Sequence, residues 1–157
     1  MKRIMISAAL AAGLLVAAVA AEEKRASMNE RASGTFEVKL EPIAQESRFP
    51  RLALEKRFSG ELEGTSEGEM MSVDSTVEGS GAYVAIERVT GTLSGRKGSF
   101  SLVHNGTMRK GGDFRLEIKV VPDSGTEQLK GLAGTMQIVI EGGKHLYHFD
   151  YSIQPES

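Results

Sequence analysis

Residues 98–108, GSFSLVHNGTM, alternate between apolar and polar side chains. Phe100, Leu102 and Met108 fall on one face of an extended chain. His104 falls on that face with them. A period of two is typical of a β-strand that buries one of its faces. The stretch therefore predicts a strand that carries an imidazole on its buried side.

Short alternating runs of the same kind recur along the chain between glycine-rich segments, and no segment shows the periodicity of an amphipathic helix. Each run has one apolar face, which indicates an antiparallel sheet that covers a single core. About eight runs are present, over residues 36–40, 52–62, 71–73, 82–93, 100–108, 114–120, 136–140 and 147–153.

An open sheet of eight strands has two edges that must be kept from pairing with other chains. Closing the sheet removes both edges, and we therefore predict an all-β fold, a closed antiparallel barrel of about eight strands. A two-sheet β-sandwich is the alternative, because sandwiches have similar strand counts. Residues 122–134 form the longest segment without a strand pattern, and we expect Leu129 and Leu132 to tuck under the sheet and plug one end.

Glycine marks the predicted connections between the strands. The glycine pairs at 111–112 and 142–143 predict tight hairpin turns. Six Gly-Thr dipeptides predict further turns or bulges, because glycine permits a positive φ and threonine favours the strand beside it. Asn105-Gly106 is a competing turn signal that would end a strand just after His104.

The first twenty residues have the plan of a secretory signal peptide. A basic start precedes an apolar run over residues 4–19, and a small-residue cleavage signature ends at Ala20. The run is short and rich in alanine for a membrane anchor, so we expect no membrane attachment after cleavage. The mature protein is therefore expected to be periplasmic or secreted.

Composition limits the other possibilities. Residues 21–32 are charged and lack an apolar face, which predicts a flexible linker before a single barrel domain over residues 33–157. The 157-residue chain has a formal net charge of −2, so it lacks the excess of Lys and Arg that nucleic-acid binding requires. It contains no cysteine, so its stability must come from packing rather than from disulfides.

Motifs for cofactors are missing from the sequence. There is no G-x-G-x-x-G and no P-loop. His145 and His148 resemble a metal-binding pair, but residues three apart on a strand face opposite sides of a sheet. The sequence therefore predicts neither a metal nor another cofactor.

Longer stretches of the chain resemble a known family. They are ASGTFEVKL, KRFSGELEGTSEGEM, GAYVAIERVTGTLSGRKGSFSL, HNGTM, VVPDSGTEQLKGLAG and GKHLYHFDY, which together span residues 32–153. They resemble an uncharacterised bacterial domain-of-unknown-function family of small β-barrels, similar in fold to allene oxide cyclase and the dirigent proteins. The resemblance implies an eight-stranded antiparallel barrel with an interior cavity, and it implies no activity.

Ionisable side chains share the apolar faces of the predicted strands. In residues 82–93 the two faces are about equally apolar, so either Glu87 or Arg88 points inward. A buried charge without a partner costs several kcal/mol, so inward groups are expected either to form a hydrogen-bonded network or to line a pocket. The other inward candidates are Lys56, Glu69, His104, His145, Tyr147 and Tyr151.

Three functions are compatible with this pattern. The first is binding of a small, largely apolar molecule inside the barrel, with His104 and Glu69 giving polar recognition. The second is an isomerase or cyclase in which His104 acts as acid or base and Glu69 or Glu87 orients it. The third is a solid barrel whose outer face pairs with itself as a homo-oligomer. The predicted ligand-binding residues of the first hypothesis are Lys56, Phe100, Leu102, His145, Tyr147 and Tyr151.

The surroundings of His104 distinguish these hypotheses. A filled interior would leave only the interaction module. A cavity with Glu69 and Glu87 within hydrogen-bond reach of His104 would favour the enzyme, whereas a cavity with His104 alone among apolar walls would favour passive binding.

Overall fold

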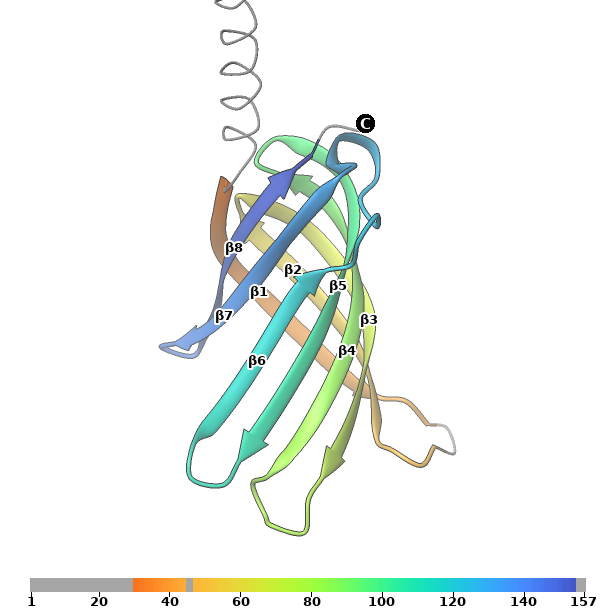
Figure 1. Ribbon diagram of the computed structural model, residues 1–157, viewed down its shortest axis with the longest axis vertical. Coiled ribbons are helices and arrows are strands. Elements are labelled where there is room, and N and C mark those ends of the chain that lie inside the picture. The colour runs from red at the N-terminus through yellow and green to blue at the C-terminus, as the bar shows by residue number, and fades with distance from the viewer. Residues whose placement is uncertain (1–29, 45–46, 155–157) are drawn as a thin grey trace, which may run out of the picture.

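The computed structural model describes residues 30–44 and 47–154 as a closed antiparallel barrel (Figure 1). Each strand pairs with the next along the chain, and the last strand pairs with the first. The closed barrel predicted from the sequence is therefore confirmed over the sandwich. Its elements are β1 (Glu30–Pro42), β2 (Arg51–Gly60), β3 (Leu62–Asp74), β4 (Gly81–Leu93), β5 (Arg96–Arg109), β6 (Asp113–Val120), the 3₁₀ turn η1 (Glu127–Leu129), β7 (Leu132–Glu141) and β8 (Lys144–Ile153).

The predicted signal peptide and most of the predicted linker lie outside the described residues. The last residues of that linker belong to β1, which begins at Glu30 rather than at residue 33. The reason is that Ala32 is fully buried against the core, although it follows a charged segment. No helix within residues 30–44 and 47–154 is both long and apolar enough to cross a membrane.

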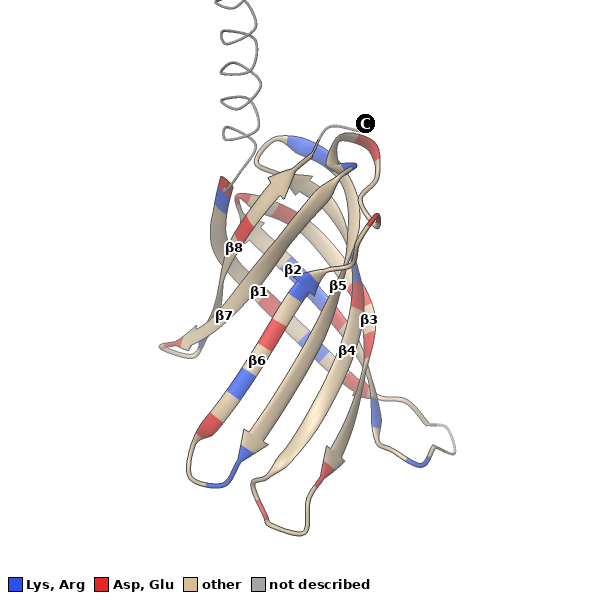
Figure 2. Ribbon diagram, in the orientation of Figure 1, with Lys and Arg blue, Asp and Glu red and all other residues tan. Residues whose placement is uncertain are grey.

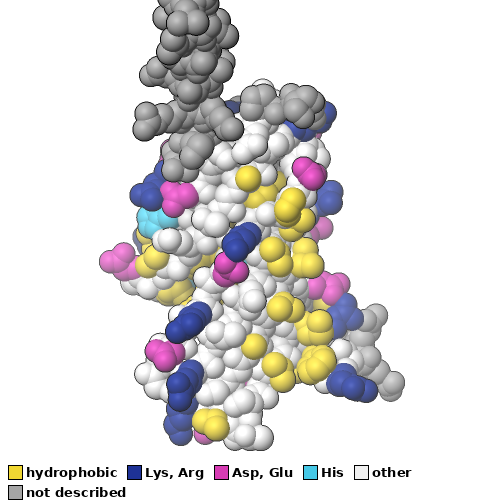
Figure 3. All heavy atoms as spheres, in the orientation of Figure 1, with side chains coloured by type: hydrophobic (Ala, Val, Ile, Leu, Met, Phe, Trp, Pro, Cys, Tyr) yellow, Lys and Arg dark blue, Asp and Glu magenta, His cyan; other side chains and the backbone are white. Residues whose placement is uncertain are grey.

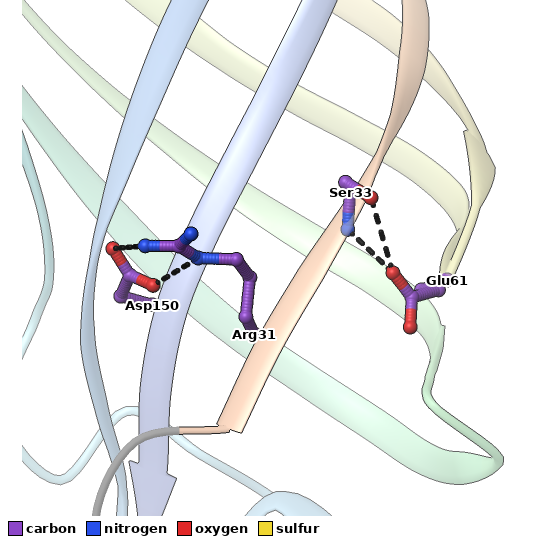
Figure 4. Close-up of polar contacts among 4 residues, drawn as sticks. All are labelled: Arg31, Ser33, Glu61 and Asp150. Atoms are coloured by element: carbon purple, nitrogen blue, oxygen red, sulfur yellow. Dashed lines mark hydrogen bonds and ion pairs between the residues drawn. The ribbon is translucent and has the colours of Figure 1, made fainter.

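Pairing of β1 with β8 closes the barrel. Arg31 lies opposite Asp150 in the register, and its guanidinium donates two hydrogen bonds to that carboxylate, at 2.7 and 3.3 Å (Figure 4). On the other side of β1, the Glu61 carboxylate accepts from the backbone N–H of Ser33 at 2.8 Å and from its hydroxyl at 3.2 Å (Figure 4). These contacts form only in the observed register of β1. A slip of one residue would break them and would also turn every inward side chain of the strand outward.

Five of the six Gly-Thr glycines lie within strands, and none of the six has a positive φ. The prediction of turns or bulges at these positions was wrong. These glycines instead leave room for neighbouring backbone and side-chain atoms inside the barrel. A Cβ on Gly34 would lie 2.1 Å from the carbonyl oxygen of Ser59, and one on Gly106 would lie 2.2 Å from a ring carbon of Tyr83. For the same reason β5 continues through Asn105-Gly106 to Arg109.

The predicted hairpin turns at 111–112 and 142–143 are confirmed, since all four glycines there have φ between 58° and 111°. In the connection from β6 to β7, the expectation that a leucine tucks under the sheet holds for one of the two leucines. Leu129 of η1 is fully buried in the core, while Leu132 is the first residue of β7 rather than part of the loop.

The inward face of β3 differs from the prediction. Met71 and Val73 point outward and are exposed, and the inward face continues from Leu62 to Met70. Between these two residues the inward positions hold only glycine and serine, so β3 shows no apolar alternation to read. The small residues are needed, because a Cβ on Gly68 would lie 2.7 Å from the Cα and the Cβ of Glu87 on β4.

One end of the barrel is packed solid. This end contains the starts of β1, β3 and β5, and its core holds side chains that are 0–2% exposed. Arg96 of β5 reaches across the opening to the Glu30 carboxylate at 2.7 and 3.0 Å, and the Tyr151 hydroxyl donates to the same carboxylate at 2.8 Å. The core residues at this end are Phe58, Leu62, Val89, Leu93, Phe100, Leu102, Leu129, Tyr147, Phe149 and Tyr151.

The opposite end is open along one side. β6 and β7 are paired only between Lys119 and Thr135, and they diverge from there (Figure 1). Along β6, whose sequence is DFRLEIKV, charged residues alternate with uncharged ones (Figure 2). Phe114 of β6 and Ile140 of β7 are exposed at this end, although both are at inward positions. The barrel is therefore sealed at one end and wide at the other.

The outer wall also carries apolar side chains. Met71, Val73, Val84, Ile86 and Val103 project outward from β3, β4 and β5 and are exposed. Figure 3 shows hydrophobic side chains gathered along this side of the molecule. Self-association, as the predicted homo-oligomer requires, remains a prediction.

We predict that Gly34→Ala lowers the free energy of unfolding by about 2 kcal/mol, because the added methyl group meets a neighbouring backbone that cannot move aside. Denaturant unfolding followed by circular dichroism measures the change. Ser59→Ala, on the exposed side of β2, is the control and should change stability by less than about 0.5 kcal/mol. Equal effects of the two substitutions would contradict the proposed role of Gly34.

Candidate functional site

A cluster of four polar side chains lies inside the barrel where the packed and open parts meet. The Glu87 carboxylate is at its centre. Its Oε1 accepts from Lys56 Nζ at 2.7 Å and from His104 Nε2 at 2.8 Å, and its Oε2 accepts from the Ser66 hydroxyl at 2.5 Å. All four residues are at most 7% exposed. Of the two alternatives left open by the sequence, Glu87 points inward and Arg88 points outward.

The register of four neighbouring strands brings these residues together. Lys56 of β2 lies directly opposite Ser66 of β3. Glu87 of β4 lies one inward position along from both Ser66 and His104, because its own partners are Gly68 on β3 and Leu102 on β5. Diagonal neighbours on one face of a sheet are within reach of long side chains. The cluster is therefore a direct product of strand pairing.

Glu87 is held in its ionised form. Burial is the largest single influence on its pKa and raises it, but hydrogen bonds and charge attraction from His104 and Lys56 together outweigh burial. The net effect lowers the pKa of Glu87 from its ordinary value of 4.5 to about 2. An ionised carboxylate only accepts hydrogen bonds, so His104 Nε2 must carry the hydrogen of their contact.

Aromatic rings support the ammonium group of Lys56. Its Nζ lies 5.1 Å from the ring centroid of Phe36 and 5.9 Å from that of Phe58. A cation over a ring face is attracted by the ring quadrupole, and more strongly when water is excluded. Lys56 is therefore compensated both by the Glu87 carboxylate and by two π-systems.

A cavity of about 410 Å³ lies on the open side of the cluster. Its walls come from all eight strands and are mainly aliphatic and aromatic. They include Leu116 of β6 and Ile138 of β7, which stand on the two sides of the diverging seam. The polar side chains that line the cavity are Lys56, Tyr83, His104 and His145.

His104 has one nitrogen committed to Glu87 and one available. Nδ1 has no hydrogen-bond partner among the described residues, and no fully buried polar side-chain atom in those residues lacks a partner. Nδ1 is therefore accessible, and the residue lines the cavity. The imidazole thus connects the internal network to the cavity.

The structure corrects the predicted role of Glu69. Its side chain is 56% exposed on the outer wall, where it pairs with Arg51. The interior prediction was wrong because it assigned Met71 to the inward face, and Glu69 shares the face of Met71. Glu69 therefore contributes neither to a cavity nor to the orientation of His104.

The remaining predicted residues divide between two places. Lys56 and His145 line the cavity together with His104. Phe100, Leu102, Tyr147 and Tyr151 point inward as predicted, but they fill the packed end and do not line this cavity. Their predicted place as cavity walls is thereby corrected, since the barrel is widest at the other end.

Two of these tyrosines use their hydroxyl groups within the packed end. The Tyr147 hydroxyl accepts from the backbone N–H of Leu62 at 2.8 Å. The Tyr151 hydroxyl donates to Glu30 at 2.8 Å. Both groups are therefore satisfied by the protein and are not offered to a ligand.

Sequence reasoning missed Ser66 of the cluster and most of the cavity walls, among them Met70 and Tyr83. Counting inward from Leu62 in steps of two would have found Ser66 and Met70, but the intervening glycines conceal this face. Tyr83 lies in residues 82–93, whose two faces are about equally apolar in sequence, so its place at the wide end was not predicted. Within the described residues, no three His, Asp or Glu side chains converge to hold a metal ion.

The fold and the cluster define a class, a small closed antiparallel β-barrel with a polar network inside. Residues 32–151 match the model of the family described as "Protein of unknown function (DUF3224)". The chain belongs to this family, which confirms the resemblance drawn from the sequence. The further likeness to allene oxide cyclase and dirigent proteins remains a prediction.

A solved structure supports the same assignment. The chain is similar to a DUF3224-family protein of unknown function from Shewanella oneidensis MR-1, whose crystal structure was determined at 1.84 Å resolution. The two are 46% identical, the match covers 82% of this chain and 99% of that one, and the TM-score is 0.77. No curated protein matches the chain.

We predict that Glu87→Gln lowers the free energy of unfolding by about 3–5 kcal/mol, because it leaves the Lys56 ammonium buried without its counter-charge. Glu69→Gln is the matched control, and loss of its exposed ion pair should cost less than about 1 kcal/mol. Urea unfolding of both variants at neutral pH measures the difference. A Glu87→Gln variant as stable as the control would contradict a structural role for the cluster.

The same carboxylate should give the protein a defined acid sensitivity. Because folding lowers the pKa of Glu87, its contribution to stability is complete above pH 4.5 and is lost as the pH falls toward about 2. Urea unfolding across this range should show a steeper loss for the unmodified protein than for Glu87→Gln, whose side chain does not titrate. Parallel curves would show that Glu87 does not carry this dependence.

Proposed function

We propose that the protein is exported and binds a small, largely apolar molecule in the open end of the barrel. The observation that carries this proposal is the cavity of about 410 Å³, which has mainly apolar walls and a polar cluster at its inner end. Pockets for small molecules typically combine apolar linings with a few placed polar groups, in volumes of roughly 300–1,000 Å³. The cavity has both properties.

The geometry favours binding over acid–base catalysis. Glu87 accepts three hydrogen bonds within the network and does not line the cavity. Its pKa of about 2 is far from neutral pH, whereas an efficient general base has a pKa near the working pH. Glu69, the other predicted partner of His104, is on the outer wall. An isomerase or cyclase thus has less support than a binding protein.

The interaction-module hypothesis required an interior that is filled near His104. The cavity adjoins His104, so the interior has room for a ligand. The exposed apolar side chains on β3, β4 and β5 are compatible with self-association in addition to ligand binding.

Export is supported by the sequence of residues 1–20, with its basic start, apolar run and small residues before the expected cleavage point. A periplasmic or extracellular binding protein without cysteine does not depend on the redox state of its compartment. This suits a barrel whose stability rests on packing and on an internal ion pair.

We predict that N-phenyl-1-naphthylamine, a neutral apolar fluorophore, binds with a stoichiometry of one and that Ala85→Phe weakens binding at least tenfold. Ala85 points into the cavity, so the added ring occupies the ligand's space. Ala53→Phe, on the outward side of β2, is the control and should leave binding unchanged. Ile138→Trp fills the cavity from another strand and should act like Ala85→Phe, with thermal unfolding confirming that each variant folds.

Native mass spectrometry of protein purified from its own host complements this test. We expect a co-purifying small molecule that is lost in Ala85→Phe and retained in Ala53→Phe. A probe that binds all the variants equally would contradict a ligand site in the barrel.

Expressed in its own host, the protein should appear in the periplasmic or culture fraction with an intact mass corresponding to a chain that begins at Ala21 or Glu22. The physical reason is that the small residues before this point suit signal-peptide cleavage. Full-length protein retained in the cytoplasm would contradict export and would leave ligand binding unaffected.

A further inference from the structure

The wall of the proposed ligand cavity stays apolar from the polar cluster to the rim of the barrel, and this inference rests on that ligand site. Leu40 of β1, Phe114 of β6 and Ile140 of β7 line the cavity at its open end. Among the described residues, Lys56 is the one Lys, Arg, Asp or Glu whose side chain lines the cavity, and it lies at the inner end. The wall therefore carries no such charge where the cavity opens.

The three rim residues are exposed, although they occupy inward positions of their strands. Leu40 is 45% exposed, Phe114 is 54% exposed and Ile140 is 68% exposed. Covering exposed hydrocarbon is favourable in proportion to the area that is removed from water. A compact molecule held beside the cluster would leave all three side chains in water, whereas a longer molecule would cover them. The rim therefore favours a ligand that extends from the cluster to the open end.

The strand register gives the length of this path. His104 lies directly opposite Ile118 of β6, and β6 runs from Phe114 at the rim to Ile118 beside the cluster. A strand rises about 3.4 Å per residue, so the path along β6 is roughly 14 Å long. Spread over that length, the cavity of about 410 Å³ has a mean cross-section of roughly 30 Å². This cross-section suits one extended chain rather than two side by side.

We propose that the ligand carries a single unbranched alkyl chain, which lies along Leu116 and Ile138 and covers the rim. Leu116 and Ile138 line the cavity together with the rim residues and continue their wall toward the cluster. This continuity favours the ligand over another macromolecule as the cover of the rim. A second copy of the protein or a membrane surface would cover the rim but would leave the inner cavity unfilled.

The first experiment varies the chain length. 1-Hexanol, 1-octanol and 1-decanol, each competing with N-phenyl-1-naphthylamine, should bind about three- to fourfold more tightly for each added methylene group. In the rim variant, Phe114→Ser combined with Ile140→Asn, the gain from 1-hexanol to 1-decanol should shrink about fivefold, because the end of the longer chain loses its wall. The ratio of two alcohols does not depend on the affinity of the fluorophore. Ile86→Asn, at a 62% exposed position on the outer wall, is the control and should leave the gain unchanged.

The second experiment uses the absence of cysteine from the sequence. The single thiol introduced by Ile140→Cys should react with dithionitrobenzoate, and saturating 1-decanol should slow the reaction about fivefold by covering the site. Saturating 1-hexanol should not slow it, because the shorter chain ends before the rim. Ile86→Cys should react at the same rate with and without either alcohol.

The outcomes separate this inference from the proposed function. An unchanged chain-length gain in the rim variant, or equal protection of Ile140→Cys by both alcohols, would overturn the extended chain and leave the ligand site in place. Self-association of the ligand-free protein in sedimentation velocity, or its binding to phosphatidylcholine vesicles, would also overturn the inference if the rim variant abolished it. Failure of the fluorophore and of every alcohol to bind would overturn both proposals.

Discussion

The ionised carboxylate of Glu87 is the constraint on which the interior depends. A carboxylate away from water must be surrounded by donors, and here three neighbouring strands supply them from Lys56, Ser66 and His104. Each donor reaches the carboxylate only in the observed strand register. A register slip on β2, β3 or β5 would leave a buried charge unpaired as well as exposing apolar side chains. The polar cluster therefore favours this strand register over the alternatives, in addition to filling part of the interior.

The cluster also divides the barrel into two parts with different properties. On one side, large aromatic residues and the contact between Arg96 and Glu30 fill and cap the interior. On the other side, the inward residues are fewer and the strands splay, so a cavity remains. A rigid packed end supporting a preformed site is the arrangement that small-molecule binding favours, because little order has to be gained when the ligand arrives.

The sequence predicted the fold well because most strands show a plain alternation. β1, β2, β5, β6, β7 and β8 turn inward the faces that their apolar residues indicated, and the inward places of Lys56 and His104 followed from this. β3 failed because its inward face is built of small residues that make room for Glu87, while its outward face carries Met71 and Val73. The glycines of the Gly-Thr dipeptides were taken for turns for the same reason, because the sequence does not show which neighbouring atoms occupy the space that a side chain would fill.

The site was predictable only in part. Period two tells which side chains point inward, but it does not tell where along the barrel axis they lie. Tyr147 and Tyr151 therefore seemed equivalent to His145, although they lie toward the packed end and His145 lies toward the open one. The choice between Glu87 and Arg88 had to wait for the pairing of β4, whose two faces are equally apolar in sequence.

The single paired position between β6 and β7 has a mechanical consequence. Elsewhere between β6 and β7 there are almost no backbone hydrogen bonds. Moving these two strands apart would therefore break few of them. The outward charged side chains of β6 disfavour pairing of its free edge with a strand of another molecule. The barrel can therefore widen between β6 and β7 at little cost in backbone hydrogen bonds, while β8 stays tied to β1 by its ladder.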